Sequence, residues 1–292
     1  MDGILLINKP KDFSSHDVVA VLRGILKTRK IGHTGTLDPD ATGLLVVGVG
    51  LGTKIMRFLN QDSKTYEAVI CIGKATDTLD EAGEVIEEKS VEHIDNFDDV
   101  LNSFKGDIVQ IPPMYSAIKY QGKRLYEYAR KGIDIPDRPK RDIHIYDIDR
   151  TSELTYENNC AYVSYKVKGS KGFYVRTLSH DIARKCGYPG YNKTLNRLQA
   201  GQFNVTDALT LEEMREGNYS FISLSDALSH MPLLEADAFI LNEIKYGRML
   251  PLKYFENTED TRIINKDNEL LAIYTKHPTK PMMKALNVFY KD

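Results

Sequence analysis

The sequence predicts an α+β protein in which a mixed, largely antiparallel sheet is bordered by peripheral helices. Segments rich in β-branched and aromatic residues recur along the chain, and helical segments interrupt them irregularly rather than in strict β-α-β alternation. The chain has 292 residues, of which 42% are hydrophobic, so it can bury a substantial core. Its length favours one large domain accompanied by a small one.

The first predicted elements are a strand and a helix. Residues 3–10, GILLINKP, are typical of a short buried strand that ends at its proline. Ser14, Ser15 and Asp17 then offer side-chain oxygens that can start a helix through VVAVLRGILK. This strand and helix lead into a glycine-rich loop.

Further strands and helices follow the loop. Strands are predicted for TYEAVICIGKAT, DIHIYDIDRTSE and CAYVSYKVKGS, which carry β-branched and aromatic residues in partly alternating order. Helices are predicted for the acidic stretch 77–99, for VEHIDNFDDVLNSFKG and for YVRTLSHDIARKCG. In the last of these, Leu178 and Ile182 recur on one face and Gly187 can end the helix.

The pattern changes beyond about Met231. A short acidic helix, LNEIKYGRMLPL, precedes RIINKDNELLAIYTK and MMKALNVFY, which are typical of short strands in a small β-rich unit. We therefore expect two domains, residues 1–230 and residues 231–292.

The composition argues against membrane-spanning, secreted, disulfide-rich and zinc-binding proteins. No apolar run approaches the roughly 18 to 20 residues that span a bilayer, and the N-terminus lacks the pattern of a signal peptide, so we expect a cytoplasmic protein with no membrane partner. Three widely spaced cysteines form no CxxC or Cys/His cluster, which argues against a disulfide framework and against a zinc site.

Charge is unevenly distributed although the formal net charge is only −2. Residues 117–141 contain eight lysines and arginines against three acids, and a second basic cluster (Arg23, Lys27, Arg29 and Lys30) precedes the glycine-rich loop. Such clusters are commonly just solvated faces, but clustered cations are also what phosphate binding requires. The acidic stretch 77–99 is expected to face away from any polyanion.

The glycine-rich loop, GHTGTLDPDATGLL, spans residues 32–45 and holds one notable carboxylate, Asp38. Glycines permit tight turns, and Pro39 restricts Asp38 toward extended conformations, so the acid is expected on a rigid loop. Taken alone, the same residues could merely start a turn or cap a helix. No Gly-Lys-Ser/Thr follows, which disfavours a nucleotide triphosphate site.

Five segments in matching order carry a resemblance to a known family. GILLINKP, GHTGTLDPDATGLL, KTYEA, PPMYSAIKYQGKRLYEYAR and GFYVRTL together resemble the tRNA pseudouridine synthase B family, from Met1 to about Val205. The resemblance implies the pseudouridine synthase fold, an RNA-binding flap at about residues 122–141 and a C-terminal PUA-like RNA-binding domain. It implies isomerisation of uridine 55 in the T loop of tRNA, with the T arm as partner, no cofactor or metal, and a monomer without an obligate protein partner.

The resemblance also implies roles for single residues. Asp38 corresponds to the catalytic aspartate, and Arg176 to the arginine that orients it. The remaining positions are implied to line the uracil pocket (Tyr174 and Leu195), stack on the base (Tyr66), fill the space left by the flipped base (His33) and support the loop (Lys9). One departure concerns a phosphate contact, because Asn196 and Arg197 stand where many relatives have two adjacent arginines.

Two alternative functions remain open from the sequence. The chain could serve mainly as a tRNA-folding chaperone with incidental modification activity. It could also be the catalytic subunit of a guide-RNA complex, whose relatives share the aspartate loop; the short and nearly neutral chain favours this interpretation least.

Overall fold

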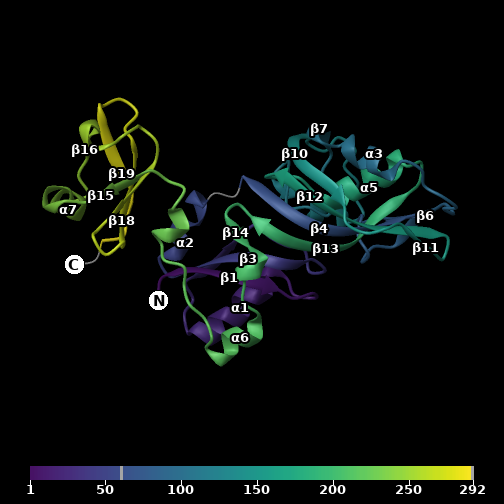
Figure 1. Ribbon diagram of the computed structural model, residues 1–292, viewed down its shortest axis with the longest axis horizontal. Coiled ribbons are helices and arrows are strands. Elements are labelled where there is room, and N and C mark those ends of the chain that lie inside the picture. Colours follow the sequence, from purple (N-terminus) through teal and green to yellow (C-terminus); the bar gives the residue numbers. More distant parts are fainter. Residues whose placement is uncertain (60–61, 291–292) are drawn as a thin grey trace.

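The computed structural model describes residues 1–59 and 62–290 and contains two main sheets (Figure 1). The α-helices are α1 Ser15–Leu26, α2 Gly52–Ile55, α3 Phe97–Asn102, α4 Leu125–Ala129, α5 Val175–Lys185, α6 Leu211–Glu216 and α7 Ala238–Lys245. Short 3₁₀ helices are η1 Met56–Phe58, η2 Val205–Asp207, η3 Asp226–Leu228 and η4 Leu252–Tyr254.

The larger sheet runs β1-β3-β13-β4-β12-β10-β7, with β2, β11 and β14 paired at its sides. Its strands are β1 Gly3–Lys9, β2 Ile31–Thr34, β3 Thr42–Val49, β4 Ser63–Ile72, β7 Gly106–Gln110, β10 Arg141–Arg150, β11 Thr155–Glu157, β12 Cys160–Ser170, β13 Gly190–Ala200 and β14 Phe203–Asn204. Among these described strands the β3–β13 pair is parallel and the other pairs are antiparallel. The predicted mixed, largely antiparallel sheet is therefore confirmed.

Helices cover the two ends of this sheet (Figure 1). At one end α1 and α6 lie together against β1 and β3, where they bury an aliphatic cluster that includes Val18, Leu22 and Met214. At the other end α3 and α5 pack against β4, β10 and β12 around Phe97, Leu178 and other buried residues. The arrangement keeps apolar helix faces out of water, which is the main source of stability for such layers.

The local signals for two helices are confirmed. Ser14 caps α1, because its hydroxyl accepts the Asp17 amide while the Asp17 carboxylate accepts from the Ser14 amide, which is a capping box. Helix α5 follows the predicted apolar face, and Gly187 lies just beyond its end at φ +87°, a left-handed conformation that glycine adopts without strain.

The prediction of a helix for the acidic stretch is wrong. Residues 77–84 form a turn between β5 Lys74–Thr76 and β6 Val85–Glu88, and only α3 Phe97–Asn102 is helical in the following segment. Three of the acids pair with cations on other elements: Glu88 with Lys74, Glu87 with Arg184, and Asp98 with Arg150. Tertiary context, here the β5–β6 pairing and these contacts with distant segments, overrides a local preference for helix.

The basic segment is mostly irregular, as its prolines predict. Two short strands, β8 Lys119–Tyr120 and β9 Lys123–Arg124, form a hairpin that runs into α4, and residues 133–140 have no regular structure. The segment joins β7 to β10.

A second sheet occupies the C-terminal part in the order β15-β17-β18-β19-β16 (Figure 1). Its strands are β15 Leu233–Glu235, β16 Leu250–Pro251, β17 Thr261–Ile264, β18 Leu270–Lys276 and β19 Met282–Val288, and α7 packs on it through Ile240 and Ile244. A further cluster joins Leu270, Ile273 and Phe289 to Ile4 and Leu6 of β1. None of the described helices is both long and apolar enough to cross a bilayer.

Candidate active site

Asp38 lies on the loop between β2 and β3, and neighbouring contacts fix this loop. Leu37 is buried, its amide donates to the Ser15 hydroxyl over 2.9 Å, and the same hydroxyl can donate to the Leu37 carbonyl at 3.2 Å. The loop closes with a hydrogen bond from the Ala41 amide to the Asp38 carbonyl at 3.1 Å. Backbone groups on both sides of Asp38 are thereby held.

Gly43, near the start of β3, occupies a position that only glycine can fill. Its φ is +97°, and a Cβ there would lie 2.4 Å from the Arg197 carbonyl oxygen of the adjacent strand β13. Only a residue without a side chain allows this close approach, which begins the parallel pairing of β3 with β13.

Arg176 lies in the first turn of α5, and its side chain is only 7% exposed. One amino group lies 3.0 Å from the Asp38 carboxylate and donates to the Tyr115 carbonyl at 2.8 Å. The other lies 3.0 Å from the Asp80 carboxylate and donates to the Thr78 carbonyl at 3.0 Å. The guanidinium is thus held by four oxygens, and it aims at Asp38 as the resemblance implies.

The helix that carries Arg176 is itself anchored to the large sheet. Ser179, one turn further along α5 and completely buried, bonds to the Tyr165 hydroxyl of β12 at 2.8 Å and to the Asn192 amide oxygen of β13 at 3.1 Å. Buried hydrogen bonds of this kind resist sliding of the helix, because breaking them would leave polar groups unpaired.

Asp80 is a site residue that sequence analysis missed. We expected its acidic stretch to face away from a polyanion, yet Asp80 and Glu81 line the same pocket as Asp38. The error has a physical reason: Arg176 compensates the Asp80 charge, so the carboxylate can lie inside the site. No local sequence pattern could indicate the Asp80–Arg176 pair, because its two residues are 96 positions apart in the chain.

The surroundings of Asp38 favour the protonated carboxyl group more than water does. Loss of water around the carboxylate raises the pKa of Asp38 above its ordinary value, although the side chain keeps 47% exposure at the mouth of the pocket. Arg176 opposes this shift, while the nearby carboxylates of Asp80 and Asp40 add to it. The arginine therefore counteracts the rise and favours the ionised form.

Lys9 bonds to backbone groups just before α1 and in the glycine-rich loop. Its side chain is buried, and its ammonium group donates to the carbonyls of Pro10, Phe13 and Pro39 at 2.9, 2.5 and 3.0 Å. Burial lowers the pKa of Lys9 to about 8, with Asp38 acting in the opposite direction. All three bonds go to backbone groups, and the supporting role that the resemblance implies stays a prediction.

The pocket residues implied by the resemblance are brought together only in part. Leu195 lines the pocket with Asp38 and Arg176. Tyr66 lies in the adjoining core cluster that contains Leu37, and its ring meets Phe173 edge-on at 5.5 Å. Tyr174 directly precedes α5, and burial raises the pKa of its phenol. Neither tyrosine is among the residues that line the pocket as it stands.

His33 lies on β2 and is not among the residues that line the Asp38 pocket. Its ring meets His16 edge-on at 5.2 Å, and burial lowers its pKa, so the neutral ring is favoured. A neutral flat ring suits stacking, and the implied role in filling the space of a flipped base stays a prediction.

Arg197 is buried rather than presented to RNA. It is 1% exposed, and its guanidinium donates to the carbonyls of Leu44 and Gly35 at 2.7 Å each. Beside it, Asn196 accepts a hydrogen bond from the Thr42 hydroxyl at 3.3 Å. Asn196 and Arg197 therefore bond to residues on both sides of Asp38 in the glycine-rich loop, a role that sequence reasoning did not assign.

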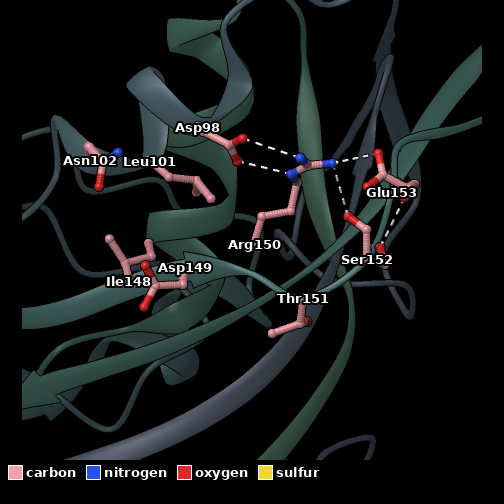
Figure 2. A pocket seen from close by; sticks show the side chains of 9 residues that line it. All are labelled: Asp98, Leu101, Asn102, Ile148, Asp149, Arg150, Thr151, Ser152 and Glu153. Carbon is pink, nitrogen blue, oxygen red and sulfur yellow. Dashed lines mark hydrogen bonds and ion pairs between the residues drawn. The ribbon is translucent and has the colours of Figure 1, made fainter.

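A separate hollow lies between α3 and β10 (Figure 2). Arg150 lies across it and is neutralised by Asp98 and Glu153 at 2.9 and 2.8 Å. The arginine has no charge to spare for a phosphate, so we assign no site here. Within the described residues no group of three or more His, Cys, Asp or Glu side chains could hold a metal ion.

Solved structures with a similar fold include a Cbf5-Nop10-Gar1 complex, whose matching chain has a TM-score of 0.70 and 23% identity, with 99% of this chain and 84% of that chain covered. A chain of an H/ACA RNP bound to a substrate RNA containing 2′-deoxyuridine gives a TM-score of 0.71 and 20% identity, covering 99% and 85%. At these identities the likeness shows that the fold is shared.

Curated relatives are more similar. "tRNA pseudouridine synthase B" of Bacillus pumilus is 40% identical, with 100% of this chain and 99% of the relative covered. The proteins of the same name from Bacillus subtilis and Staphylococcus aureus are each 42% identical, covering 96% of this chain and 94% and 96% of theirs. The family model "TruB family pseudouridylate synthase (N terminal domain)" matches residues 23–175. The chain therefore belongs to the TruB family of pseudouridylate synthases.

Proposed function

We propose that the protein isomerises the uridine at position 55 of the tRNA T loop to pseudouridine, with Asp38 as the catalytic carboxylate. The main support for this proposal is the ion pair of 3.0 Å between Asp38 and the buried Arg176, in a pocket that Leu195 also lines. Relatives of about 40% identity over nearly the whole chain, named as tRNA pseudouridine synthases, support the substrate.

The reaction breaks the bond from C1′ of the ribose to N1 of uracil, rotates the base, and forms a bond from C1′ to C5. The proton leaves C5 and N1 gains one, so atoms and charge balance without a redox change. A carboxylate can assist at the sugar carbon, as carboxylates do in glycoside hydrolysis. Arg176 holds that carboxylate in one orientation, and its planar cation favours the ionised form.

The RNA must present its uridine flipped out of the stack, at a cost of roughly a few kcal/mol. The flap carries exposed cations that can contact phosphates, and its Arg124 and Arg130 lie over the Tyr126 ring at 5.8 and 5.3 Å. We propose that this surface grips the T arm. We further propose that residues 231–292 act as a PUA-like RNA-binding domain beside the 1–230 catalytic domain, in a cytoplasmic monomer without an obligate protein partner.

The test is to incubate the purified full chain with a T-arm stem-loop RNA and to map modified uridines. One pseudouridine at the position equivalent to 55 is expected. Modification elsewhere would reject the assigned position, and absence of pseudouridine from both the stem-loop and intact tRNA would reject the proposed function.

The pH dependence follows from the raised pKa of Asp38. The carboxylate must be ionised to assist at C1′, so the single-turnover rate is expected to fall as pH falls through that pKa. Because the pKa lies above its ordinary value of about 3.9, the loss should begin at a higher pH than for a typical aspartate. Rates measured with enzyme in saturating excess test this, and an unchanged rate down to about pH 4 would contradict it.

A further inference from the structure

The flap belongs to a longer inserted segment, residues 111–140, that leaves and re-enters the large sheet at one point. Strand β7 ends at Gln110, β10 begins at Arg141, and these two residues are paired across the strands. The two ends of the inserted segment therefore join the sheet side by side at the Gln110–Arg141 pair.

Gln110 uses its side chain to grip the start of α5. The side chain is buried, its amide nitrogen donates to the Tyr174 carbonyl at 3.0 Å, and its amide oxygen accepts from the Tyr174 amide at 2.8 Å. The planar amide thus satisfies both backbone groups of one residue, much as a neighbouring strand would. Arg176 follows two residues later.

Two more contacts connect the same parts. The Thr177 hydroxyl donates to the Ile111 carbonyl at 3.4 Å, and Arg176 donates to the Tyr115 carbonyl at 2.8 Å. The first turn of α5 therefore bonds to the inserted segment close to its base. Of these contacts, the two-point bond of Gln110 is the shortest link that does not use Arg176 itself.

We propose that Gln110 is a positioning residue, which fixes the first turn of α5 against the base of the inserted segment so that Arg176 meets Asp38. The inference rests on the proposed function. RNA held by the flap would thereby stabilise the catalytic ion pair through the Tyr174 backbone, without Gln110 touching the substrate.

Two substitutions separate positioning from simple structural support. Gln110→Met removes both bonds and leaves the Tyr174 amide unpaired, while the Tyr174 carbonyl keeps only its bond from the Leu178 amide at 3.0 Å. The first turn of α5 can then shift, and a misplacement of about 1 Å can cost about 100-fold in rate. Gln110→Glu keeps the acceptor but loses the donor when ionised. When protonated, its O–H can donate to the Tyr174 carbonyl and restore the pair of bonds.

The experiment compares the wild type, both variants and the control Gln202→Met, whose amide donates to the Ala227 carbonyl at 3.0 Å in another part of the fold. For each full-length protein, single-turnover rate, tRNA affinity and melting temperature are measured. Gln110→Met is expected to lose about 10- to 100-fold in rate with tRNA affinity near wild type, and Gln202→Met to lose little. The rate of Gln110→Glu relative to the wild type should rise as pH falls from about 8 to about 6.

Several outcomes would overturn the proposal while leaving the proposed function intact. They are a wild-type rate in Gln110→Met, a loss that follows tRNA affinity or melting temperature, and a Gln110→Glu ratio that does not change with pH. If Gln110→Met fails to fold, the pH series of Gln110→Glu decides alone. A wild type that forms no pseudouridine would instead reject the proposed function.

Discussion

Replacing Asp38 with asparagine is expected to stop pseudouridine formation while tRNA binding stays close to the wild-type level. The amide has nearly the same shape as the carboxylate, but it carries no charge to pair with Arg176 and cannot assist at C1′. Loss of an essential charged group of this kind should lower the single-turnover rate by about 1,000-fold or more. Quantifying pseudouridine in tRNA after incubation with excess enzyme measures the loss.

A matched control is Asp149→Asn, since Asp149 is an aspartate on β10 whose side chain is 63% exposed and pairs with Lys105. This variant should keep the wild-type rate, because exposed ion pairs contribute little. Turnover by Asp38→Asn at a comparable rate would refute the catalytic assignment. A cell carrying only Asp38→Asn distinguishes the chaperone alternative, because normal tRNA function there would mean that binding suffices.

Replacing Arg176 with lysine is expected to lower the rate by about 100- to 1,000-fold. A single ammonium group cannot hold the carboxylates of Asp38 and Asp80 together with two carbonyls, as the forked guanidinium does. Because one ammonium group cannot stay beside both carboxylates, Asp38 should lose part of its cationic partner and gain a still higher pKa. The acid limb of the rate profile should therefore move to higher pH, which the same single-turnover assay can follow.

Arg184→Lys provides the control on the same helix. Arg184 is 43% exposed and pairs with Glu87, so a lysine there should preserve both the rate and the pH profile. Asp80→Asn tests the other contact of Arg176, because it removes the carboxylate charge beside one amino group and leaves that group the Thr78 carbonyl and a neutral amide. We expect a slower reaction because the guanidinium is then less firmly aimed. An Arg176→Lys variant with the wild-type rate and an unmoved acid limb would contradict the proposed role.

The sequence predicted the parts of the site that lie within short motifs. Asp38 and Arg176 each belong to a segment whose local pattern resembles the family, and the structure brings them together. Asp80 and Gln110 could not be predicted in the same way, because their roles depend on contacts between distant segments. Arg197 was considered only as a possible phosphate contact, since nothing local indicates that its side chain bonds to the glycine-rich loop.

The fold shows the same division between local and distant information. The helix starting at Ser15 could be predicted because its capping box is formed by Ser14 and Asp17, which are close in the sequence. The acidic stretch misled the prediction, because its charges are balanced by cations that only the folded chain brings near, such as Arg184 beside Glu87. Strand pairing order likewise depends on long-range contacts rather than on local propensity.

The apolar cluster shared by the first strand and the C-terminal sheet has a consequence for biosynthesis. Ile4 and Leu6 leave the ribosome first, yet the cluster to which they belong is completed by Leu270, Ile273 and Phe289. At ordinary elongation rates these partners appear on the order of 15 to 60 s later. During that interval the cluster around the first strand is incomplete, and the apolar surface it still exposes is a natural place for a chaperone to bind.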